Sequence, residues 1–270
     1  MARKTKKDIY KDFGIDFVKV TKSTWHINTP IGHMPPVLVK GNEKIGNVWH
    51  FSTLPGSKEY NVTIANGKQV TMCGTCAGNC ENGYCMVGRY VMRNVQDSLA
   101  NKTVLARDYM AFLDKAIRAQ IIADHIDKVR IHVTGDFFSR EYLNMWVNIV
   151  NDFPAVTFWT YTKEQAAETA FDHFENANIV KSNIPGIGYN FGHIDYVIAI
   201  YNMLKDMGKS VYICRCGTDD QQHCDTCKAC ALCEYVLFLE HGTDYDAKKD
   251  PNYNKAVEII DAQDKSFITE

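Results

Sequence analysis

Residues Lys128–Lys163 read KVRIHVTGDFFSREYLNMWVNIVNDFPAVTFWTYTK, and this stretch decides the fold. Two runs rich in β-branched and aromatic residues, Lys128–Val133 and Val156–Tyr161, predict strands. Between them, Arg140–Asn151 places its apolar residues on one face at helical spacing, which predicts a helix. A strand, a helix and a strand at this spacing predict parallel pairing through a right-handed crossover.

The same alternation continues on both sides of this stretch and predicts an α/β fold. Further strands are predicted at Val37–Val39, Asn47–Thr53, Ile179–Ser182, Ser210–Cys214 and Tyr235–Leu239. Helices are predicted at Val87–Ala123, Glu164–Glu175 and Ile194–Met207, and in the tail after Lys248. Asn66-Gly67 predicts a hairpin turn.

We expect three parts along the chain. Residues 1–46 form a basic N-terminal arm and a loop-rich lead, residues 47–242 form the core, and residues 243–270 form a C-terminal tail or helix. Glycine and proline are frequent between Trp25 and Gly46, which favours loops there.

Length and charge exclude several classes of protein. The 270 residues include 30 Lys and Arg and 32 Asp and Glu, so the chain has no excess of positive charge. This excludes a general nucleic-acid coat protein, although a local basic patch is not excluded. No apolar run approaches the ~18 residues of a membrane span. The basic segment Met1–Asp8 is not followed by an apolar stretch, so we expect no secretory signal and a cytoplasmic protein without membrane contact.

The ten cysteines lie in two tight groups. The first group is Cys73, Cys76, Cys80 and Cys85, and the second is Cys214, Cys216, Cys224, Cys227, Cys230 and Cys233. A disulfide framework would spread cysteines along a small secreted chain, whereas tight groups in a cytosolic chain indicate metal binding. Disulfides and unligated thiols are the alternatives.

The first group has the spacing C-x2-C-x3-C-x4-C, with Gly74, Gly78 and Gly83 between the cysteines. Glycine lets the backbone fold tightly around an ion and aim N–H groups at sulfur. Four thiolates so close in sequence suit a tetrahedral zinc site that staples a loop, or an iron–sulfur cluster. The spacing alone does not decide between these metals.

In the second group, Cys224–Cys233 has the spacing C-x2-C-x2-C-x2-C, which is close to a ferredoxin cysteine run. Cys214 and Cys216 supply a C-x-C pair at the end of a predicted strand, and His223 is one more candidate ligand. Six cysteines exceed the four that one site needs, so either two thiols are free or the two groups share ligands. A zinc ribbon is the alternative here.

Polar residues follow two neighbouring predicted strands. His132, Asp136 and Lys163 lie at or just past their carboxyl ends, the edge at which α/β proteins build their sites. They are candidate catalytic residues, although each could be a core polar group or, for Asp136, a helix cap. The candidate cofactor-binding residues are three glycines and one asparagine, namely Gly135, Gly186, Gly188 and Asn190. The last three lie in the loop Pro185–Gly192, which is either a mobile loop or a ligand cradle.

Several motifs together resemble phage and prophage proteins of the gene product 88-like family. They are CGTCAGNCENGYC at 73–85, the stretch at 130–164, NIPGIGYNFG at 183–192, CDTCKACALC at 224–233 and VLFLEHG at 236–242. That family is distantly similar to radical S-adenosylmethionine (SAM) enzymes. The resemblance implies a partial (β/α) barrel-like parallel sheet, with two cysteine-rich metal-binding loops and substrate at the strand ends.

The resemblance implies an enzyme as the first functional hypothesis. Three of Cys73, Cys76, Cys80 and Cys85 would bind a [4Fe-4S] cluster that cleaves SAM, with electrons from a reductant protein. The second cysteine group would bind an auxiliary cluster or zinc, and His132, Asp136 and Lys163 would position an unknown substrate. The alternative is a non-enzymatic module, stapled by zinc or clusters, that binds nucleic acid or a host or phage protein. Only the basic arm with Arg3, Lys4, Lys6 and Lys7 favours nucleic acid.

Overall fold

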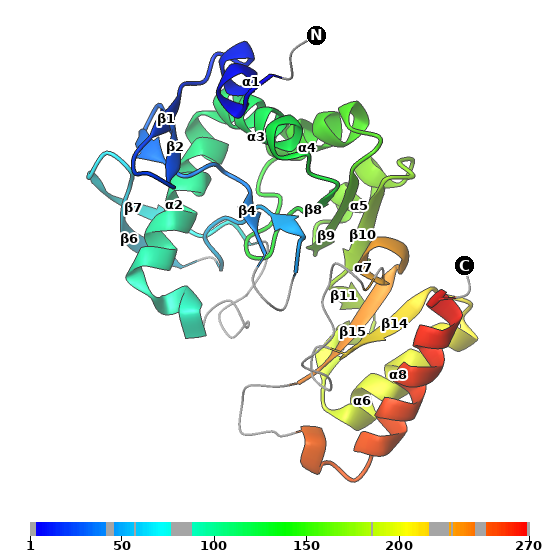
Figure 1. The fold of residues 1–270 in the computed structure, drawn as a ribbon. Coiled ribbons are helices and arrows are strands. Elements are labelled where there is room, and N and C mark those ends of the chain that lie inside the picture. Colours follow the sequence, from blue (N-terminus) through cyan, green and yellow to red (C-terminus); the bar gives the residue numbers. More distant parts are fainter. Residues whose placement is uncertain are drawn as a thin grey trace.

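The computed structural model describes residues 4–41, 46–56, 58–76, 88–184, 186–215, 227, 229–240 and 247–268. Figure 1 shows a larger N-terminal lobe, in which helices lie over a sheet, and a smaller C-terminal lobe beside it. The two lobes meet where the green strands of the first approach the orange strand of the second (Figure 1).

A five-stranded sheet forms the centre of the larger lobe. In spatial order its strands are β10 (Ala177–Lys181), β9 (Thr157–Thr162), β8 (Lys128–Arg130), β5 (Trp49–His50) and β4 (Val39–Lys40). All neighbours pair in parallel except β4 and β5. The parallel pairing predicted from the sequence is therefore confirmed for β8 and β9.

Helices cover one face of this sheet. They are α2 (Arg93–Asp108), α3 (Met110–Asp124), α4 (Arg140–Asp152) and α5 (Gln165–Phe171). Ser139 caps α4 by accepting a hydrogen bond from the Tyr142 amide at 3.1 Å. The predicted apolar face of α4 is buried, and its Trp146 meets the Phe51 ring edge-on, with centroids 5.6 Å apart.

The lead contains more regular structure than the sequence predicts. It begins with α1 (Lys6–Asp12) and continues in an antiparallel meander of β1 (Phe17–Lys19), β2 (Trp25–Thr29) and β3 (Gly32–Met34). Tyr10 stacks on Phe17 at 4.7 Å and ties the helix to the meander. The predicted turn at Asn66-Gly67 is confirmed, because it joins β6 (Glu59–Thr63) to β7 (Gln69–Cys73).

The C-terminal lobe is a second, smaller parallel sheet with its own core. Its strands are β13 (Phe191–Gly192), β15 (Tyr235–Leu239) and β14 (Val211–Cys214), in that spatial order. The remaining elements are the strands β11 (Asn183–Ile184) and β12 (Gly188–Tyr189), the helices α6 (Ile194–Asp206), α7 (Ala229–Leu232) and α8 (Tyr253–Ile268), and the 3-10 helices η2 (Gly88–Val91) and η4 (Ala247–Lys249). The red helix α8 and α6 lie along the same side of this sheet (Figure 1).

The two sheets meet at β10 and β15. The Lys181 amide donates to the Glu234 carbonyl at 3.1 Å, and the Lys181 ammonium lies 2.9 Å from the Glu234 carboxylate and 3.3 Å from that of Glu168. These contacts place the edge strand β10 of the larger sheet beside the smaller sheet. The partial barrel and the domain boundaries stay predictions.

Two predicted strands are regular over only part of their length. Asn47–Thr53 contains β5 and Lys128–Val133 contains β8, which ends because His132 adopts a φ of 105°. Hydrogen bonds continue beyond both formal ends, from the Phe51 amide to the Arg130 carbonyl and from the Thr53 amide to the Thr134 carbonyl. The two segments therefore stay side by side up to the residues that follow β8.

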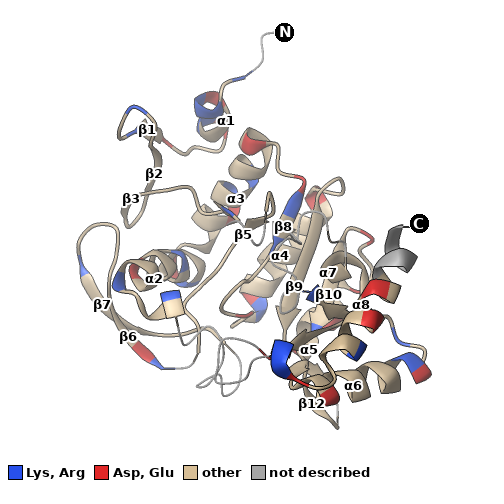
Figure 2. Ribbon diagram, turned by 60° about the horizontal axis from the view of Figure 1, so that its bottom comes forward, with Lys and Arg blue, Asp and Glu red and all other residues tan. Residues whose placement is uncertain are grey.

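The distribution of charged residues differs between the helices and loops on one hand and the central strands on the other. Figure 2 shows Lys, Arg, Asp and Glu mainly on helices and loops, whereas most of β9 is tan and β8 carries blue. Cationic side chains on a central strand are unusual because such strands are buried on both faces.

Among the helices that the structure describes, none is both long and apolar enough to cross a bilayer.

Candidate functional site

The loop after β8, Thr134–Asp136, is packed tightly against the segment after β5. Gly135 has a φ of 85°, and a Cβ there would lie 1.8 Å from the Thr53 hydroxyl oxygen and 2.6 Å from that of Thr75. The two threonine hydroxyls lie 2.6 Å apart, and the Thr134 hydroxyl donates to the Thr53 carbonyl at 2.7 Å. Only glycine fits at position 135, which explains its place in the motif.

Asp136 is buried at the carboxyl ends of β8 and β9. Its Oδ1 accepts hydrogen bonds from the Thr162 hydroxyl at 2.6 Å and the Phe137 amide at 2.9 Å, and its Oδ2 accepts one from the Lys163 amide at 3.2 Å. Burial raises the pKa of Asp136 to about 6, although these hydrogen bonds oppose the shift. A carboxyl group that titrates near neutral pH suits proton transfer.

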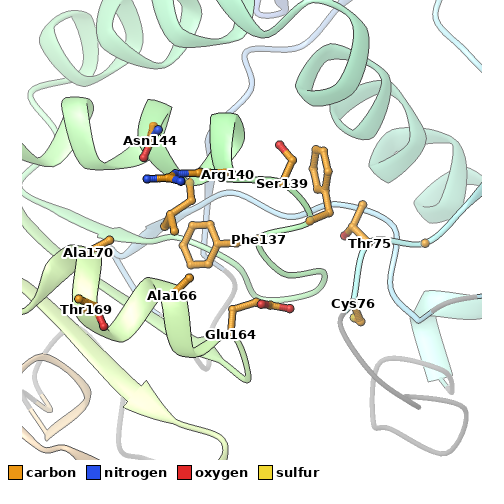
Figure 3. A pocket seen from close by; sticks show the side chains of 13 residues that line it. Thr75, Cys76, Phe137, Ser139, Arg140, Asn144, Glu164, Ala166, Thr169 and Ala170 are labelled. Atoms are coloured by element: carbon orange, nitrogen blue, oxygen red, sulfur yellow. The ribbon is translucent and has the colours of Figure 1, made fainter.

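A pocket of about 710 Å³ opens beside this loop. Its walls come from Gly74–Cys76, from Phe137–Arg140 with the first turn of α4, and from the start of α5. Figure 3 shows Arg140 and Asn144 on one side, whereas Glu164 points towards the side on which Cys76 lies. The pocket therefore combines an apolar floor around Phe137 with polar groups of both charges, as small-molecule sites do.

The first cysteine group is described at two of its four positions. Cys73 is exposed at the end of β7, and Cys76 lines the pocket. The Cys76 sulfur accepts a hydrogen bond from the Gly56 amide at 3.1 Å. Cys80 and Cys85 lie outside the described residues. The structure thus brings one predicted metal ligand to the same edge of the sheet as Asp136.

Four cysteines of the second group gather around one cluster of buried residues. Cys233 belongs to this cluster with Val180, Tyr212 and Val236, and Cys214, Cys227 and Cys230 pack against it. Cys214 comes from the end of β14, and the other three cysteines come from the segment around α7. The fold therefore packs cysteines from two separate segments in or against one apolar cluster, and a metal site there stays a prediction.

Two side chains from the larger lobe contact this cysteine group. The Tyr161 hydroxyl lies 2.8 Å from the Cys230 sulfur. The side-chain amide of Asn178 donates to the carbonyls of Cys230 and Cys233, both at 2.8 Å. Burial raises the pKa of Cys230 to about 11, and the hydrogen bond with Tyr161 works against that shift.

Among the described residues, no three His, Cys, Asp or Glu side chains are arranged so that they could hold a metal ion as they stand. Cys216, His223 and Cys224 lie outside the described residues. The chemistry of the donor set fits a thiophilic metal, because Cys233 belongs to an apolar cluster and three more cysteines pack against it.

His132 points into the aromatic core of the larger lobe. Its Nε2 lies 2.9 Å from the Tyr142 hydroxyl, and its ring meets Phe137 edge-on at 4.8 Å. Its Nδ1 is buried and has no hydrogen-bond partner in the described structure. Burial lowers the pKa of His132 to about 3, so the ring is neutral at pH 7. Its catalytic role stays a prediction.

Lys163 and the predicted cofactor-binding loop lie close together. The Lys163 ammonium lies 5.0 Å from the centroid of the Tyr189 ring, in the loop that carries Gly186 and Gly188. Both glycines have positive φ, 75° and 135°. Asn190 is buried and its side chain donates to the Val236 carbonyl at 2.8 Å, which ties the loop to β15. A ligand-binding role for these residues stays a prediction.

Sequence reasoning missed a group of polar side chains on β5, β8 and β9. His50 and Arg130 are register partners on neighbouring strands, and the Arg130 guanidinium lies 4.7 Å from the centroid of the Tyr161 ring. Lys102, on α2, is also buried. One signal was available for Lys102, since it lies three residues from both Leu99 and Leu105 on the apolar face of a predicted helix.

The basic arm forms contacts within the chain. The Lys4 ammonium lies 2.6 Å from the Asp12 carboxylate, and Lys6 forms an ion pair with Asp124. Arg3 lies outside the described residues. These pairs reduce the local positive charge that the nucleic-acid hypothesis requires.

Comparisons with known proteins give one family. The sequence model of a family described as Gene product 88 matches residues 36–185, more than half of the chain. The Gene 88 protein of Mycobacterium phage D29 is 28% identical over 138 residues, which cover 43% of this chain and 58% of that protein. The Gene 88 protein of Mycobacterium phage L5 is 50% identical over 38 residues, 14% of this chain and 16% of that protein. The chain thus spans less than two thirds of either relative, and no solved structure matches it.

Proposed function

This chain belongs to the gene product 88 family, and from that premise we propose that it is a metal protein whose cysteines hold an iron–sulfur cluster. The observation that carries the proposal is the gathering of Cys214, Cys227, Cys230 and Cys233 around one buried cluster beside Tyr161. These residues come from two segments that only the fold brings together, so their proximity is not a consequence of sequence spacing alone.

The surroundings of the second cysteine group support a cluster site. Apolar side chains shield the sulfurs, Tyr161 can donate a hydrogen bond to the Cys230 sulfur, and Asn178 fixes the backbone of the segment that carries Cys230 and Cys233. Hydrogen bonds to sulfur and exclusion of water are the means by which proteins tune such clusters. A cluster bound there would supply one-electron transfer.

The second cysteine group favours iron over zinc as the proposed metal. A zinc ion and an iron–sulfur cluster each take four cysteines, so the count of six does not separate them, whereas the run at 224–233 has a spacing close to that of the ferredoxins. A protein that holds zinc at both groups and acts as a stapled binding module is the competing proposal. Measured metal content separates the two.

The finer form of the proposal concerns the pocket beside Asp136. Cys76 lines that pocket, and with Cys73, Cys80 and Cys85 it would hold a cluster for reductive cleavage of SAM. Asp136 would hold in place the segment from Phe137 that lines the pocket, and Arg140 and Glu164 would orient the charged groups of the substrate. The apolar wall around Phe137 would keep water from the reacting atoms.

The test is anaerobic purification followed by iron, sulfide and zinc analysis, with an absorption spectrum near ~400 nm. We expect iron and sulfide in equal amounts. Cys230→Ser and Cys76→Ser each probe one group, so each is expected to lower the iron content without abolishing it. Stoichiometric zinc without iron would overturn the proposal. SAM cleavage is assayed on the same samples as release of 5′-deoxyadenosine, and its loss in Cys76→Ser but not in Cys230→Ser would support the finer form.

A further inference from the structure

Two aromatic rings are exposed side by side in the chain between β11 and α6. Tyr189 exposes 48% of its surface and Phe191 exposes 50%. The two rings stack with their centroids 6.1 Å apart and their planes at 29° to each other. Ile187 and Tyr196 are also exposed and lie in the same short stretch of sequence. Large apolar side chains that a folded protein exposes together mark a binding surface.

The backbone beneath these rings is anchored. Asn190, which separates the two aromatic residues in sequence, is buried, and its side-chain amide donates to the Val236 carbonyl at 2.8 Å. The Tyr196 hydroxyl donates to the Tyr189 carbonyl at 3.0 Å, and a Cβ at Gly192 would lie only 2.7 Å from the Tyr196 ring. The rings are therefore presented to solvent by a fixed backbone, and a preformed surface loses little conformational freedom when it binds.

Lys163 brings a positive charge to the same surface. It directly follows β9, and its ammonium lies 5.0 Å from the centroid of the Tyr189 ring. The carboxyl ends of parallel strands are the edge at which α/β proteins bind ligands. Two features that the sequence analysis selected separately, Lys163 and the glycine-rich loop, are thus in contact, and the cysteine sites do not use either of them.

Stacked rings beside an ammonium match the chemistry of a nucleotide, which joins a planar base to a phosphate. Every base has a face that stacks on an aromatic side chain, and lysine attracts phosphate as a point charge. A small ligand buries most of its surface in a cavity, whereas about half of each ring is open here. Single-stranded nucleic acid binds open surfaces of this kind through successive stacked bases. Lysine is depleted in interfaces between proteins, so Lys163 favours a nucleic acid over a protein partner.

We propose that Tyr189, Phe191 and Lys163 form a stacking surface for single-stranded nucleic acid, with bases on the two rings and a phosphate at the ammonium. The inference goes beyond the proposed function, since it needs no metal and rests on other side chains. It also uses none of the residues of the basic arm.

The experiment is a fluorescence anisotropy titration of the purified full chain. The probes are a labelled oligothymidylate and a labelled oligouridylate of about 15 nucleotides each, and a labelled DNA duplex of the same length. We expect at least one single strand to bind, and the duplex to bind about tenfold more weakly because its bases are already stacked. The stronger of the two strands indicates whether the surface serves DNA or RNA.

Variants at Phe191 test the stacking itself. Phe191→Ala is expected to weaken binding of the single strand roughly tenfold, and Phe191→Trp is expected to keep it. The added indole should also be quenched by the strand, beyond any quenching in the wild type. Phe191 is half exposed, so we expect the melting temperature of each variant to stay close to that of the wild type. Should Phe191→Ala not fold, quenching in Phe191→Trp decides the question.

Lys163→Met tests the phosphate contact. We expect the plot of log affinity against log salt concentration to become less steep by about 0.7, the value for one phosphate contact on a single strand. Trp25→Ala is the matched control. Trp25 is 37% exposed, its ring stacks on Phe17 at 5.0 Å, and the Lys19 ammonium lies 5.7 Å from it. Because Phe17 is buried, that site presents one ring instead of two, and Trp25→Ala should keep the affinity.

Four results would overturn the proposal. They are no binding of either single strand, equal binding of the duplex, an unchanged affinity in Phe191→Ala without quenching in Phe191→Trp, and competition by thymidine monophosphate as strong as that by the unlabelled strand. Analytical ultracentrifugation covers the protein alternative. If the wild type is a dimer and Phe191→Ala is a monomer, the rings contact a second copy of the chain, and the proposal is wrong.

Discussion

The Tyr161 hydroxyl lies 2.8 Å from the Cys230 sulfur and connects the central sheet of the larger lobe to the cysteine group of the smaller lobe. Both residues are partly buried, and desolvation raises the pKa of each side chain. A donor fixed against sulfur favours the thiolate, the form that binds metals. The contact therefore couples the geometry of β9 to the chemistry of the proposed cluster site.

Removal of this hydroxyl is expected to make Cys230 less reactive. In metal-free Tyr161→Phe, the thiolate loses a hydrogen bond, so alkylation of Cys230 by iodoacetamide at pH 9 should slow by roughly fivefold. Peptide mass spectrometry measures the rate. Cys73, which is exposed, should react at the same rate in both proteins. An unchanged rate at Cys230 would show that the hydroxyl does not act on the sulfur.

Asn178 is expected to affect metal content, whereas its near neighbour Asn176 is not. Each side-chain amide braces a loop by donating to backbone carbonyls, those of Cys230 and Cys233 for Asn178 and those of Val150, Phe153 and Val156 for Asn176. Alanine at either position should cost about 2 kcal/mol of unfolding free energy.

Iron per chain distinguishes the two variants. Asn178→Ala is expected to lose iron because the segment carrying two ligands loosens, whereas Asn176→Ala should retain it. Equal iron content in the two variants would contradict the placement of the cluster at the second cysteine group.

Gly135 and Gly67 provide a matched pair for the loop after β8. Both have nearly the same φ, 85° and 83°, but an added Cβ would meet nothing within 4 Å at Gly67 and would clash with Thr53 and Thr75 at Gly135. Gly67→Ala should cost about 1 kcal/mol, from backbone strain alone. Gly135→Ala should cost roughly 3 kcal/mol more, because the tightly packed side chains of Thr53 and Thr75 must move. Urea denaturation measures both, and equal losses would show that the loop is not packed as described.

Asp136 is expected to make stability depend on pH. Its pKa in the folded protein is about 6, above the usual value of 3.8, so the folded state binds the proton more tightly than the unfolded state does. The resulting stabilisation is fully present below pH 3.8 and is lost as the pH rises through 6. A shift of about two units corresponds to roughly 3 kcal/mol.

Asp136→Asn provides the comparison, since an amide does not titrate. The unfolding free energy of the wild type minus that of the variant should fall between pH 4 and pH 7, as measured by urea denaturation at each pH. Parallel pH profiles for the two proteins would contradict the raised pKa.

The elements with strong local patterns were predicted well. The strand Tyr235–Leu239 and the helix from Arg140 were placed correctly or within one residue, because a continuous apolar run and a one-sided helical face each have few competing structures. The strands β1, β2 and β3 of the lead were missed, since each has at most five residues and their burial depends on Tyr10, Phe17 and other residues distant in sequence.

The candidate site was predicted only in part. Asp136 and Cys76 could be placed at one edge because the ends of parallel strands meet there. The contacts of Cys230 with Tyr161 and Asn178 could not be predicted, since they arise where the two lobes meet and no local pattern records that meeting. His132 follows a strand in sequence, yet its positive φ turns the ring into the aromatic core.

Native mass spectrometry of the anaerobically purified chain tests the proposed cluster most directly. We expect a mass that exceeds that of the polypeptide by whole iron–sulfur clusters, with one cluster fewer in Cys230→Ser. A chain that carries no added mass, or only the mass of bound zinc, would contradict it.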